Sequence, residues 1–456
     1  MLRLSESIRQ NDPSMQAMME TVENAPRLTE MVLAAWRLGL ALAAKVVTEE
    51  LGQRAARPTA WPACPHCGLV RLWSKGLVRR EMKTLLGKIV WWRRTGRCPR
   101  GCKIGQTAPL DEALGLVPYQ RTSFELQQLA CWSAVFLPFE TAAHFVQRFT
   151  RVSVSAAAIW GWVQDFGQRA QARLARELEQ LEAGQLPAEE PLDEQTAAQA
   201  LLIGADGVMV PFRRKAGSPK RKIRWREVKV AVLARLGQHT TRTGQTVSRL
   251  EQRRLVAVLG DIDALSPRLW LEALRQGLRS AKLVAWLSDG GRGFWRLYAA
   301  RFAAPATGIL DFYHAAQNLW KGTAAWLDGR TKRAHTWFAG ARHQLRHGQA
   351  EEVLADIAAA LDLDGLPTSA YETLTKLYAY LDKHRAHFDY QKFKALGLPL
   401  GSGLVESACK WLIQQRFKGV GMRWSEEGFN YLLHLKLDWV NGRFDDLFHL
   451  RSSPNF

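Results

Sequence analysis

Acidic residues are scarce in this sequence. It has 43 Asp and Glu against 63 Lys and Arg, which leaves a formal net charge of +20 over 456 residues. This imbalance argues against an acidic or neutral surface and favours a polyanionic partner, most often nucleic acid. Ribosome-associated and membrane-surface proteins share the same bias. Hydrophobic residues make up 47% of the chain and tryptophan occurs 18 times, which excludes a disordered chain.

Long hydrophobic runs are also missing. No run of about 18 uncharged apolar residues occurs, so the sequence predicts no transmembrane helix. The N-terminal segment MLRLSESIRQNDPSMQ lacks the apolar core of a signal peptide. We therefore expect a cytoplasmic protein whose thiols stay reduced.

Cysteine is rare, and four of the six residues stand in two close pairs. Cys64 and Cys67 belong to CPHC, and Cys98 and Cys102 belong to CPRGC. Two such pairs can present four thiolates to Zn²⁺, and the apolar and basic alternation between them is typical of short strands. We predict a structural zinc ribbon, because so small a core gains stability from a metal. Four independent thiols are the alternative, since the second pair has three intervening residues.

Helical periodicity follows the ribbon. The segments PFETAAHFVQRFT, RVSVS and AAAIWGWVQDFGQRA have the order helix, short turn, helix. Ser153 or Ser155 is placed to cap the second helix, which would lie in a DNA major groove if this is a helix-turn-helix. An ordinary helical hairpin has the same pattern and is the alternative.

An acidic segment with two prolines, EAGQLPAEEPLDEQTAAQ, then indicates a linker and a domain boundary. A chain of this length is expected to form two to four domains. We predict an N-terminal helical segment (1–57), the zinc ribbon (58–110), a helical helix-turn-helix-like DNA-binding region (111–182), the linker (183–199) and an α/β domain (200–456).

Beyond the linker, strand-like runs give way to strands that alternate with helices. The runs ALLIGADGVMVPF, WREVKVAVLARLG and RRLVAVLG precede a helix, and AKLVAWLSDGG is a fourth strand. This order predicts a mixed α/β layer, whose ligand site lies where strand ends converge. Asp206 lies within or at the end of the first strand, and Asp289 follows the fourth. Their carboxylates meet if those two strands are neighbours.

A third acid, Glu406, lies in a basic, glycine-rich segment, LPLGSGLVESACKWLIQQRFKGVGMRW. By itself it is explained as a helix-start charge that pairs with Lys410. Together with Asp206 and Asp289, it would complete a set of oxygen ligands suited to Mg²⁺ or Mn²⁺. Two such ions can activate an attacking oxygen and stabilise a leaving one during phosphodiester displacement.

The segments GADGVMVPF, LSDGG, DFYH and GSGLVESACKWLIQQRFKGVGMRW resemble the motifs of DDE transposases from bacterial insertion sequences. The nearest likeness is the ISKra type, which is related to Mutator-like elements. The resemblance covers roughly residues 200–440, and its most specific motif runs from Gly401 to Trp424. It implies an RNase H-like fold, with a helical insertion at about 312–400.

The resemblance also implies roles for single residues. Asp206, Asp289 and Glu406 would be the catalytic triad that binds the metal ions. Asp311 and His314 resemble a D-x-x-H element near the active site, so His314 is a further catalytic candidate, with a structural histidine as the alternative.

Basic and aromatic residues near these acids are candidates for DNA contacts. The tip PFRRKAGSPKRKIRWR is either a solvated loop or a contact to the DNA backbone, and Trp424 is the aromatic residue placed to stack on an unpaired base. The predicted DNA-binding residues are Lys410, Arg416, Lys418, Arg423, Trp424, Arg213, Arg214 and Lys215.

The implied function is metal-dependent cleavage and strand transfer of an insertion sequence. The ribbon and helix-turn-helix would recognise terminal inverted repeats, and the protein would act on double-stranded DNA at the bacterial nucleoid as a homodimer or larger assembly. Two alternatives stay open: an RNase H-fold nuclease without strand transfer, and a non-catalytic DNA-binding protein derived from a transposase.

Overall fold

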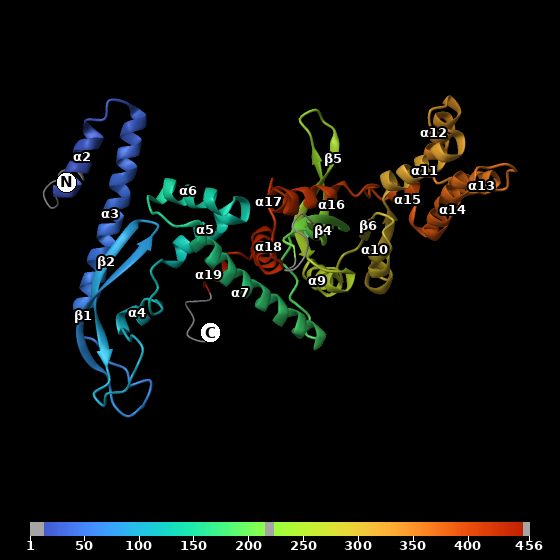
Figure 1. Ribbon diagram of the computed structural model, residues 1–456. Helices are drawn as coiled ribbons and strands as arrows, with labels where there is room; N and C mark the ends of the chain where they lie inside the picture. Colours follow the sequence, from blue (N-terminus) through green and yellow to red (C-terminus); the bar gives the residue numbers. More distant parts are fainter. Residues whose placement is uncertain (1–12, 215–222, 450–456) are drawn as a thin grey trace. The chain divides into compact units, whose positions relative to one another are not determined.

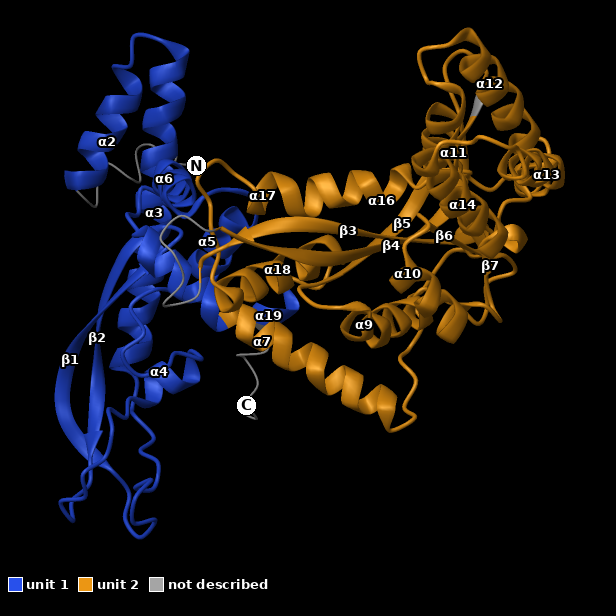
Figure 2. Ribbon diagram, turned by 45° about the vertical axis from the view of Figure 1, so that its right-hand side comes forward, with its two compact units in different colours: residues 1–165, 445–456 blue, residues 166–444 orange. Residues whose placement is uncertain are grey.

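The structure is a computed structural model that describes residues 13–214 and 223–449. The described chain forms two compact units, residues 13–165 with 445–449 and residues 166–444 (Figure 2). The boundary falls inside helix α7 (Ala156–Glu182) and therefore within the region predicted as one helical domain. The long helix begins in the first unit and continues into the second.

The first unit opens with a hairpin of two helices, α2 (Pro13–Glu23) and α3 (Leu28–Ala56) (Figure 1). In the described residues, α3 alone is long and apolar enough to cross a membrane, with a mean hydropathy of 1.6 over its best 18-residue window. Only 11% of that window is buried. The sequence-based expectation of no transmembrane helix rested on the absence of an uncharged run, and it stays a prediction. One such helix is weak evidence for a membrane span.

Strands β1 (Trp73–Thr84) and β2 (Gly87–Arg97) form the antiparallel hairpin predicted between the cysteine pairs. A small core lies on one face of this hairpin, where Met82, Ile89 and Trp91 are buried against partly buried leucines. Helix α4 (Pro109–Ala113) is joined to the hairpin through Asp111, whose carboxylate accepts a 2.8 Å hydrogen bond from Arg93 Nε. This apolar core is small, as the sequence predicted.

Three helices complete the first unit: α5 (Phe124–Phe136), α6 (Phe139–Thr150) and the start of α7, with the short α19 (Asp446–His449). Arg151 ends α6 in the left-handed conformation, with φ 61°. The Ser155 hydroxyl caps α7 by accepting a 3.1 Å hydrogen bond from the Ala158 N–H. The order of helix, turn and helix is the predicted one, and it is common to DNA-binding pairs and ordinary helical hairpins.

The second unit is built on a five-stranded mixed sheet of order β5-β4-β3-β6-β7. Strand β4 pairs antiparallel with β3 and β5, whereas β6 pairs parallel with β3 and β7. The predicted mixed layer is confirmed in this form. The strands are β3 (Ala200–Phe212), β4 (Arg224–Thr240), β5 (Thr246–Val258), β6 (Val284–Ser288) and β7 (Thr307–Leu310).

Central strands of this sheet are covered on both faces, which explains their continuous apolar sequences. Every residue of β6 is buried, and so are Leu201, Leu202 and Ile203 of β3. Helix α9 (Ile262–Arg275) follows β5. Helix α10 (Arg292–Leu297) follows β6 and continues into a π-helical turn at Tyr298–Phe302.

The segment between β7 and the Glu406 region is helical, as predicted. It contains α11 (Phe312–Leu327), α12 (Lys332–Arg346), α13 (Ala350–Leu361), α14 (Thr368–Lys383) and α15 (Tyr390–Ala395) (Figure 1). Helices α11 and α14 approach closely at Gly322, where an added Cβ would lie 2.5 Å from Leu377. The chain then returns to the sheet through α16 (Gly403–Ala408), a π-helical segment (Cys409–Gln414), α17 (Gln415–Phe417) and α18 (Glu426–Val440).

Candidate active site

Two aspartates stand one residue beyond the last paired row of the neighbouring parallel strands β3 and β6. In the ladder between β3 and β6, Ala205 is the partner of Ser288. Asp206 and Asp289 are the next residues on each strand, so they follow the last paired row together. The prediction that these carboxylates lie together required the first and fourth strands to be neighbours. Strands β3 and β6 fulfil this condition.

Hydrogen bonds orient both of these acids. Asp206 Oδ1 accepts from the Gly207 N–H at 2.6 Å, and Asp289 Oδ1 accepts from the Gly291 N–H at 3.0 Å. The Trp295 indole N–H also donates to the Asp289 carbonyl at 2.7 Å. The turn after β6 is thus fixed by its own backbone and by α10.

Glu406 lies in the first turn of α16, directly after the Gly-Ser-Gly turn that the sequence indicated as a helix start. Its side chain is exposed. No ion pair between Glu406 and Lys410 is present in the described part of the chain, which removes the pairing proposed in the simpler interpretation. A π-helical segment follows at Cys409–Gln414, and such irregular turns are frequent at functional sites.

Asp311 connects the end of the sheet to the turn before Glu406. The side chain is 1% exposed, caps α11 by accepting from the His314 N–H at 2.8 Å, and accepts a short hydrogen bond from the Ser402 N–H. Burial alone would raise the pKa of Asp311, but the hydrogen bonds from His314 and Ser402 lower it to about 2. Sequence reasoning left the role of this residue open. Its partner Ser402 has no sequence signal beyond the turn.

The site is electrostatically coupled. Burial raises the pKa of Asp206, and the nearby charges of Asp289 and Glu406 raise it further, against the opposing Gly207 N–H and His314. The pKa of His314 is raised, first by the contact of its ring with the Asp311 carboxylate and then by the charges of Asp311, Asp289 and Glu406. His314 Nδ1 lies 3.3 Å from Asp311 Oδ1. The three acids and His314 therefore share one region.

The donor chemistry of this region suits a hard cation. None of Asp206, Asp289 and Glu406 forms an ion pair with Lys or Arg within residues 13–214 and 223–449, although the chain carries a net charge of +20. Their ligand atoms do not all lie within 4.8 Å of one another, a distance that only the four cysteines satisfy in the described chain. The oxygen atoms of the three carboxylates are therefore too far apart to form one tight cluster of the kind that the cysteines form.

A helix of the insertion packs directly on this site. An added Cβ at Gly290, next to Asp289, would lie 2.0 Å from the Tyr380 ring of α14, so glycine is required here. The charges of Asp289 and Asp311 add to the burial that raises the pKa of Tyr380 to about 12. Sequence periodicity placed Tyr380 on a helix and did not connect it with the acids.

The four predicted zinc ligands come together. The sulfur atoms of Cys64, Cys67, Cys98 and Cys102 all lie within 4.8 Å of one another, and Cys67 Sγ is 3.9 Å from Cys98 Sγ. A hydrogen bond from the Leu69 backbone is the largest influence on the Cys67 thiol and lowers its pKa to about 7. This arrangement forms a cluster that can hold a metal such as zinc.

The predicted DNA-binding residues divide into two groups. The side chains of Lys410, Lys418, Arg423, Arg213 and Arg214 are exposed. Lys418 Nζ lies 5.7 Å from the centre of the Trp225 ring, and Arg213 Nε donates to the Arg423 carbonyl at 3.3 Å. Lys215 lies outside the described residues.

Arg416 and Trp424 lie further inside than the other predicted DNA-binding residues. Arg416 is only 2% exposed, and its guanidinium lies 5.3 Å from the centre of the Trp424 ring. The Trp424 indole N–H donates to the Phe417 carbonyl at 3.0 Å, and its ring packs on Phe417 and Phe429. Arg416 is therefore buried beneath the glycine-rich segment, which leaves little of its side chain for a DNA contact, whereas Trp424 is half-buried and its predicted stacking on a base stays a prediction.

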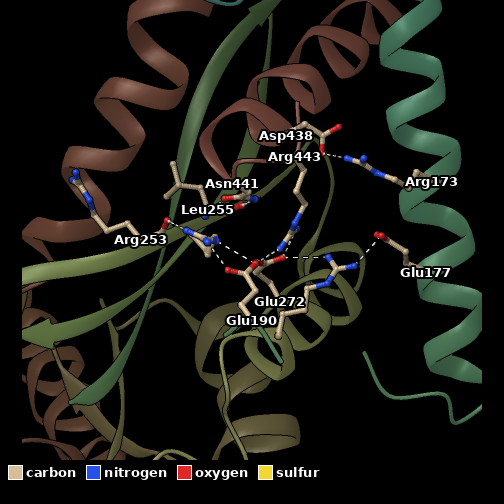
Figure 3. A network of polar contacts seen from close by, with 11 residues as sticks. Arg173, Glu177, Glu190, Arg253, Leu255, Glu272, Asp438, Asn441 and Arg443 are labelled. Atoms are coloured by element: carbon tan, nitrogen blue, oxygen red, sulfur yellow. Dashed lines mark hydrogen bonds and ion pairs between the residues drawn. The ribbon is translucent and has the colours of Figure 1, made fainter. Parts of the chain in front are cut away.

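Ion pairs join the predicted linker to other parts of the second unit, to which it belongs. Glu190 accepts hydrogen bonds from Arg254 and, at 2.7 Å, from Arg443, which also donates to the buried Glu272 at 2.8 Å (Figure 3). On the neighbouring helix α7, Arg173 pairs with Asp438 at 2.6 Å. Within the acidic segment that the sequence predicts as a linker, Glu190 thus provides an ion-pair partner for Arg254 and Arg443.

Comparisons with known proteins assign no family. No family model and no curated protein matches the sequence. Among solved structures, the Drosophila P element transposase strand transfer complex matches over 71% of this chain and 92% of that chain, with 9% identity and a TM-score of 0.31. A likeness at this level carries no argument about the function of this chain.

Proposed function

We propose that this protein is a DDE transposase with an RNase H-like catalytic domain, which cleaves the ends of a bacterial insertion sequence and joins them to target DNA. The observation that carries the proposal is the pairing of β3 with β6, which aligns Asp206 and Asp289 one residue beyond their last paired row. Glu406 lies on a helix 117 residues after Asp289 in the sequence, and its charge contributes to the raised pKa of Asp206.

Asp206, Asp289 and Glu406 would hold divalent cations, Mg²⁺ or Mn²⁺. When bound, these ions would supply activation of an attacking oxygen and stabilisation of a leaving one. Mutual repulsion among the acids, which contributes to the raised pKa of Asp206, is the property that a bound cation relieves.

The remaining polar residues would position the substrate. His314, oriented by Asp311, would hold a proton beside the scissile phosphate. The exposed Lys410, Lys418 and Arg423 would contact the phosphate backbone on either side of the acids.

The first unit would recognise DNA. Zn²⁺ held by the four cysteines would stabilise the β1–β2 hairpin, and α7 would lie in a major groove at the terminal inverted repeats. Because two ends must be joined, the protein would act as a homodimer or larger assembly, and it would do so at the bacterial nucleoid.

A strand-transfer assay tests this function. The DNA carries the sequences that flank the coding region, and Mg²⁺ or Mn²⁺ is supplied. Wild type is expected to join these ends to a target plasmid, whereas Asp206→Asn, Asp289→Asn and Glu406→Gln bind the DNA without joining it. Asp263→Asn is the matched control, since this acid is exposed and pairs with Arg296 at 2.8 Å.

Each other outcome selects an alternative. Cleavage without joining indicates an RNase H-fold nuclease, and binding without cleavage under either metal indicates a non-catalytic DNA-binding protein. Full activity of Glu406→Gln would mean that Glu406 is only a helix-start charge.

A further inference from the structure

A groove of about 1150 Å³ lies along β5, the edge strand of the sheet. Its walls come from β5, from the π-helical segment that follows Glu406 and from the end of α18. Its apolar part includes Leu250, Leu404, Trp411 and Trp439, whereas the three acids of the candidate active site do not line it. This β5 groove therefore has no role in the proposed chemistry.

A β-bulge shapes the wall that β5 contributes. The ladder between β4 and β5 shifts between Leu233 and Arg235, so Gln252 and Arg253 together stand opposite one residue of β4. Gln252 has a left-handed φ of 45°. Bulges bend a strand and redirect its side chains. Consequently all five residues 249–253 line the groove, whereas a regular strand presents alternate residues to one face.

Positive charge on this wall lacks a partner. Arg249 and Arg253, the groove arginines, are exposed, and neither forms an ion pair within the part of the chain that the structure describes. The one acid of the lining, Glu251, accepts a 2.9 Å hydrogen bond from Gln199 Nε2. Lys410 adds a third cation. The β5 groove therefore complements an apolar group that is flanked by carboxylates.

Two tryptophans shape the apolar part of the groove. The rings of Trp411 and Trp439 are half-buried, with centroids 6.0 Å apart and an interplanar angle of 48°. Lys436 Nζ lies 5.5 Å from the centre of the Trp411 ring, so a cation already occupies one side of that ring. Stacking of a planar group requires a parallel ring face. This tryptophan notch therefore suits a branched aliphatic side chain better than a nucleobase.

The chain itself contains a segment of complementary character. Residues 350–367 hold five acids and no Lys or Arg, in a sequence with a net charge of +20. They form α13 and the loop before α14. In this loop, Asp362, Leu363 and Asp364 are exposed, Leu363 by 53%. Neither aspartate forms an ion pair among the described residues. This acidic loop (362–364) thus presents an aliphatic side chain between two unpaired carboxylates.

The acidic loop does not fill the β5 groove of its own chain. Helix α13 packs on α12 and α14, and neither α13 nor the loop contributes a residue to the lining of the groove. A second copy of the chain is therefore the occupant that the sequence itself provides. If each of two copies places its loop in the groove of the other, the two contacts close a symmetric dimer.

We propose that the tryptophan notch receives Leu363 of a second copy, while the groove arginines pair with the two aspartates of its acidic loop. The inference rests on the proposed function for the need to assemble, and it supplies the surface through which two copies meet. Burial of the leucine would provide affinity, and the charges at the rim would guide encounter and fix orientation.

Charge reversal tests this pairing by sedimentation velocity without DNA. Wild type is expected to self-associate at low salt and to do so less at high salt, because salt screens the ion pairs at the rim. The loop variant Asp362→Arg/Asp364→Arg and the groove variant Arg249→Glu/Arg253→Glu should each associate about 100-fold more weakly, because like charges then face each other. Lys410 stays unchanged, since it is assigned to DNA above.

A mixture of the two variants provides the decisive measurement. The reversed loop of one variant meets the reversed groove of the other, and the second contact joins the two native surfaces. The mixture is therefore expected to regain association close to that of wild type. This recovery also shows that both variants are folded, because a misfolded partner could not restore the contact.

Three single substitutions make the result specific. Leu363→Ala should weaken self-association about 10-fold without lowering the unfolding temperature, because this side chain is exposed in the single chain. Arg242→Glu, in the turn between β4 and β5 outside the groove, should associate as wild type. Glu372→Arg, at an exposed position of α14 outside the loop, should do the same.

Several results would overturn the proposal. A monomeric wild type at low salt would do so, as would a mixture that does not regain association. If the groove variant alone loses association, another segment occupies the groove. If the groove variant loses DNA affinity and associates as wild type, the groove is a DNA surface. Asp206→Asn should associate as wild type, so association without strand transfer contradicts only the proposed function.

Discussion

Substitution of Asp311 by Asn tests whether one buried carboxylate holds the candidate active site together. The wild-type carboxylate accepts hydrogen bonds from the backbone of His314 and Ser402 and lies 3.3 Å from the His314 ring. An Asn side chain has a similar shape but no charge, and one of its ends donates hydrogen bonds. The NH2 group of the Asn side chain would face one of these backbone N–H groups, and two donors cannot form a hydrogen bond with each other.

The magnitude follows from the pKa of Asp311. It is lowered from 3.8 to about 2 in a side chain that is 1% exposed. A difference of nearly two pH units corresponds to about 2 kcal/mol of stability. Because the pKa is depressed, this contribution is present above about pH 4 and is lost as the pH falls through about 2. The variant should therefore be less stable than wild type at pH 7, and the difference should shrink toward pH 3.

Urea unfolding at both pH values measures the global effect, and hydrogen exchange of residues 400–408 measures the local one. At pH 7, exchange in this segment should be about 30-fold faster in the variant, which is the equivalent of the same free energy. Asp389→Asn is a matched control, since Asp389 is an exposed cap that accepts from the Lys392 N–H at 3.2 Å. The reasoning is refuted if Asp311→Asn costs no more than the control, or if its effect is unchanged at pH 3.

Four other changes have expected outcomes. Cys102→Ser, or treatment with a zinc chelator, should destabilise the β1–β2 hairpin, seen as loss of bound zinc and faster proteolysis between the cysteine pairs. Arg443→Met should cost about 3 kcal/mol in urea unfolding, because it leaves the buried Glu272 without its closest cation. Trp424→Ala should cost about 3 kcal/mol through lost packing, and equal stability would restore an exposed role for this residue. Burial raises the pKa of Asp438 to about 6, against its partner Arg173, so its contribution to stability should fall as the pH rises from about 4 through 6; a wild-type pH profile that matches Asp438→Asn would exclude this.

Local patterns in the sequence predicted much of the architecture. Alternation of apolar and basic residues between the cysteine pairs predicted the hairpin, and periodicity predicted the helices between β7 and Glu406. These features are local, because a strand or helix that buries one face must repeat its apolar residues with the period of the backbone. At residues 183–199 the acidic composition predicted a linker but did not indicate that Glu190 pairs with the distant Arg254 and Arg443.

Side-chain environments were the part that local pattern left undecided. Arg416 and Trp424 stand in a basic, glycine-rich segment that suggested DNA contacts. Arg416 is nevertheless buried over the Trp424 ring, and Trp424 is half-buried against Phe417 and Phe429. Asp311 and Tyr380 had no assigned role, and each contacts the candidate site from a different element. Burial depends on residues far away in the chain, which no window of sequence contains.

The sequence by itself determined the order of the elements, the cysteine pairs and the acids near strand or helix boundaries. Each of these features depends only on the spacing of residues that are close together in the chain. The tertiary structure decided which of these meet. The pairing of β3 with β6 aligns Asp206 with Asp289. Hydrogen bonds from the Ser402 N–H to Asp311 and from the Phe312 N–H to the Leu400 carbonyl join the turn before Glu406 to the end of β7. Such long-range contacts are selected by the packing of the whole domain, since many pairings satisfy the same local pattern and one buries the core.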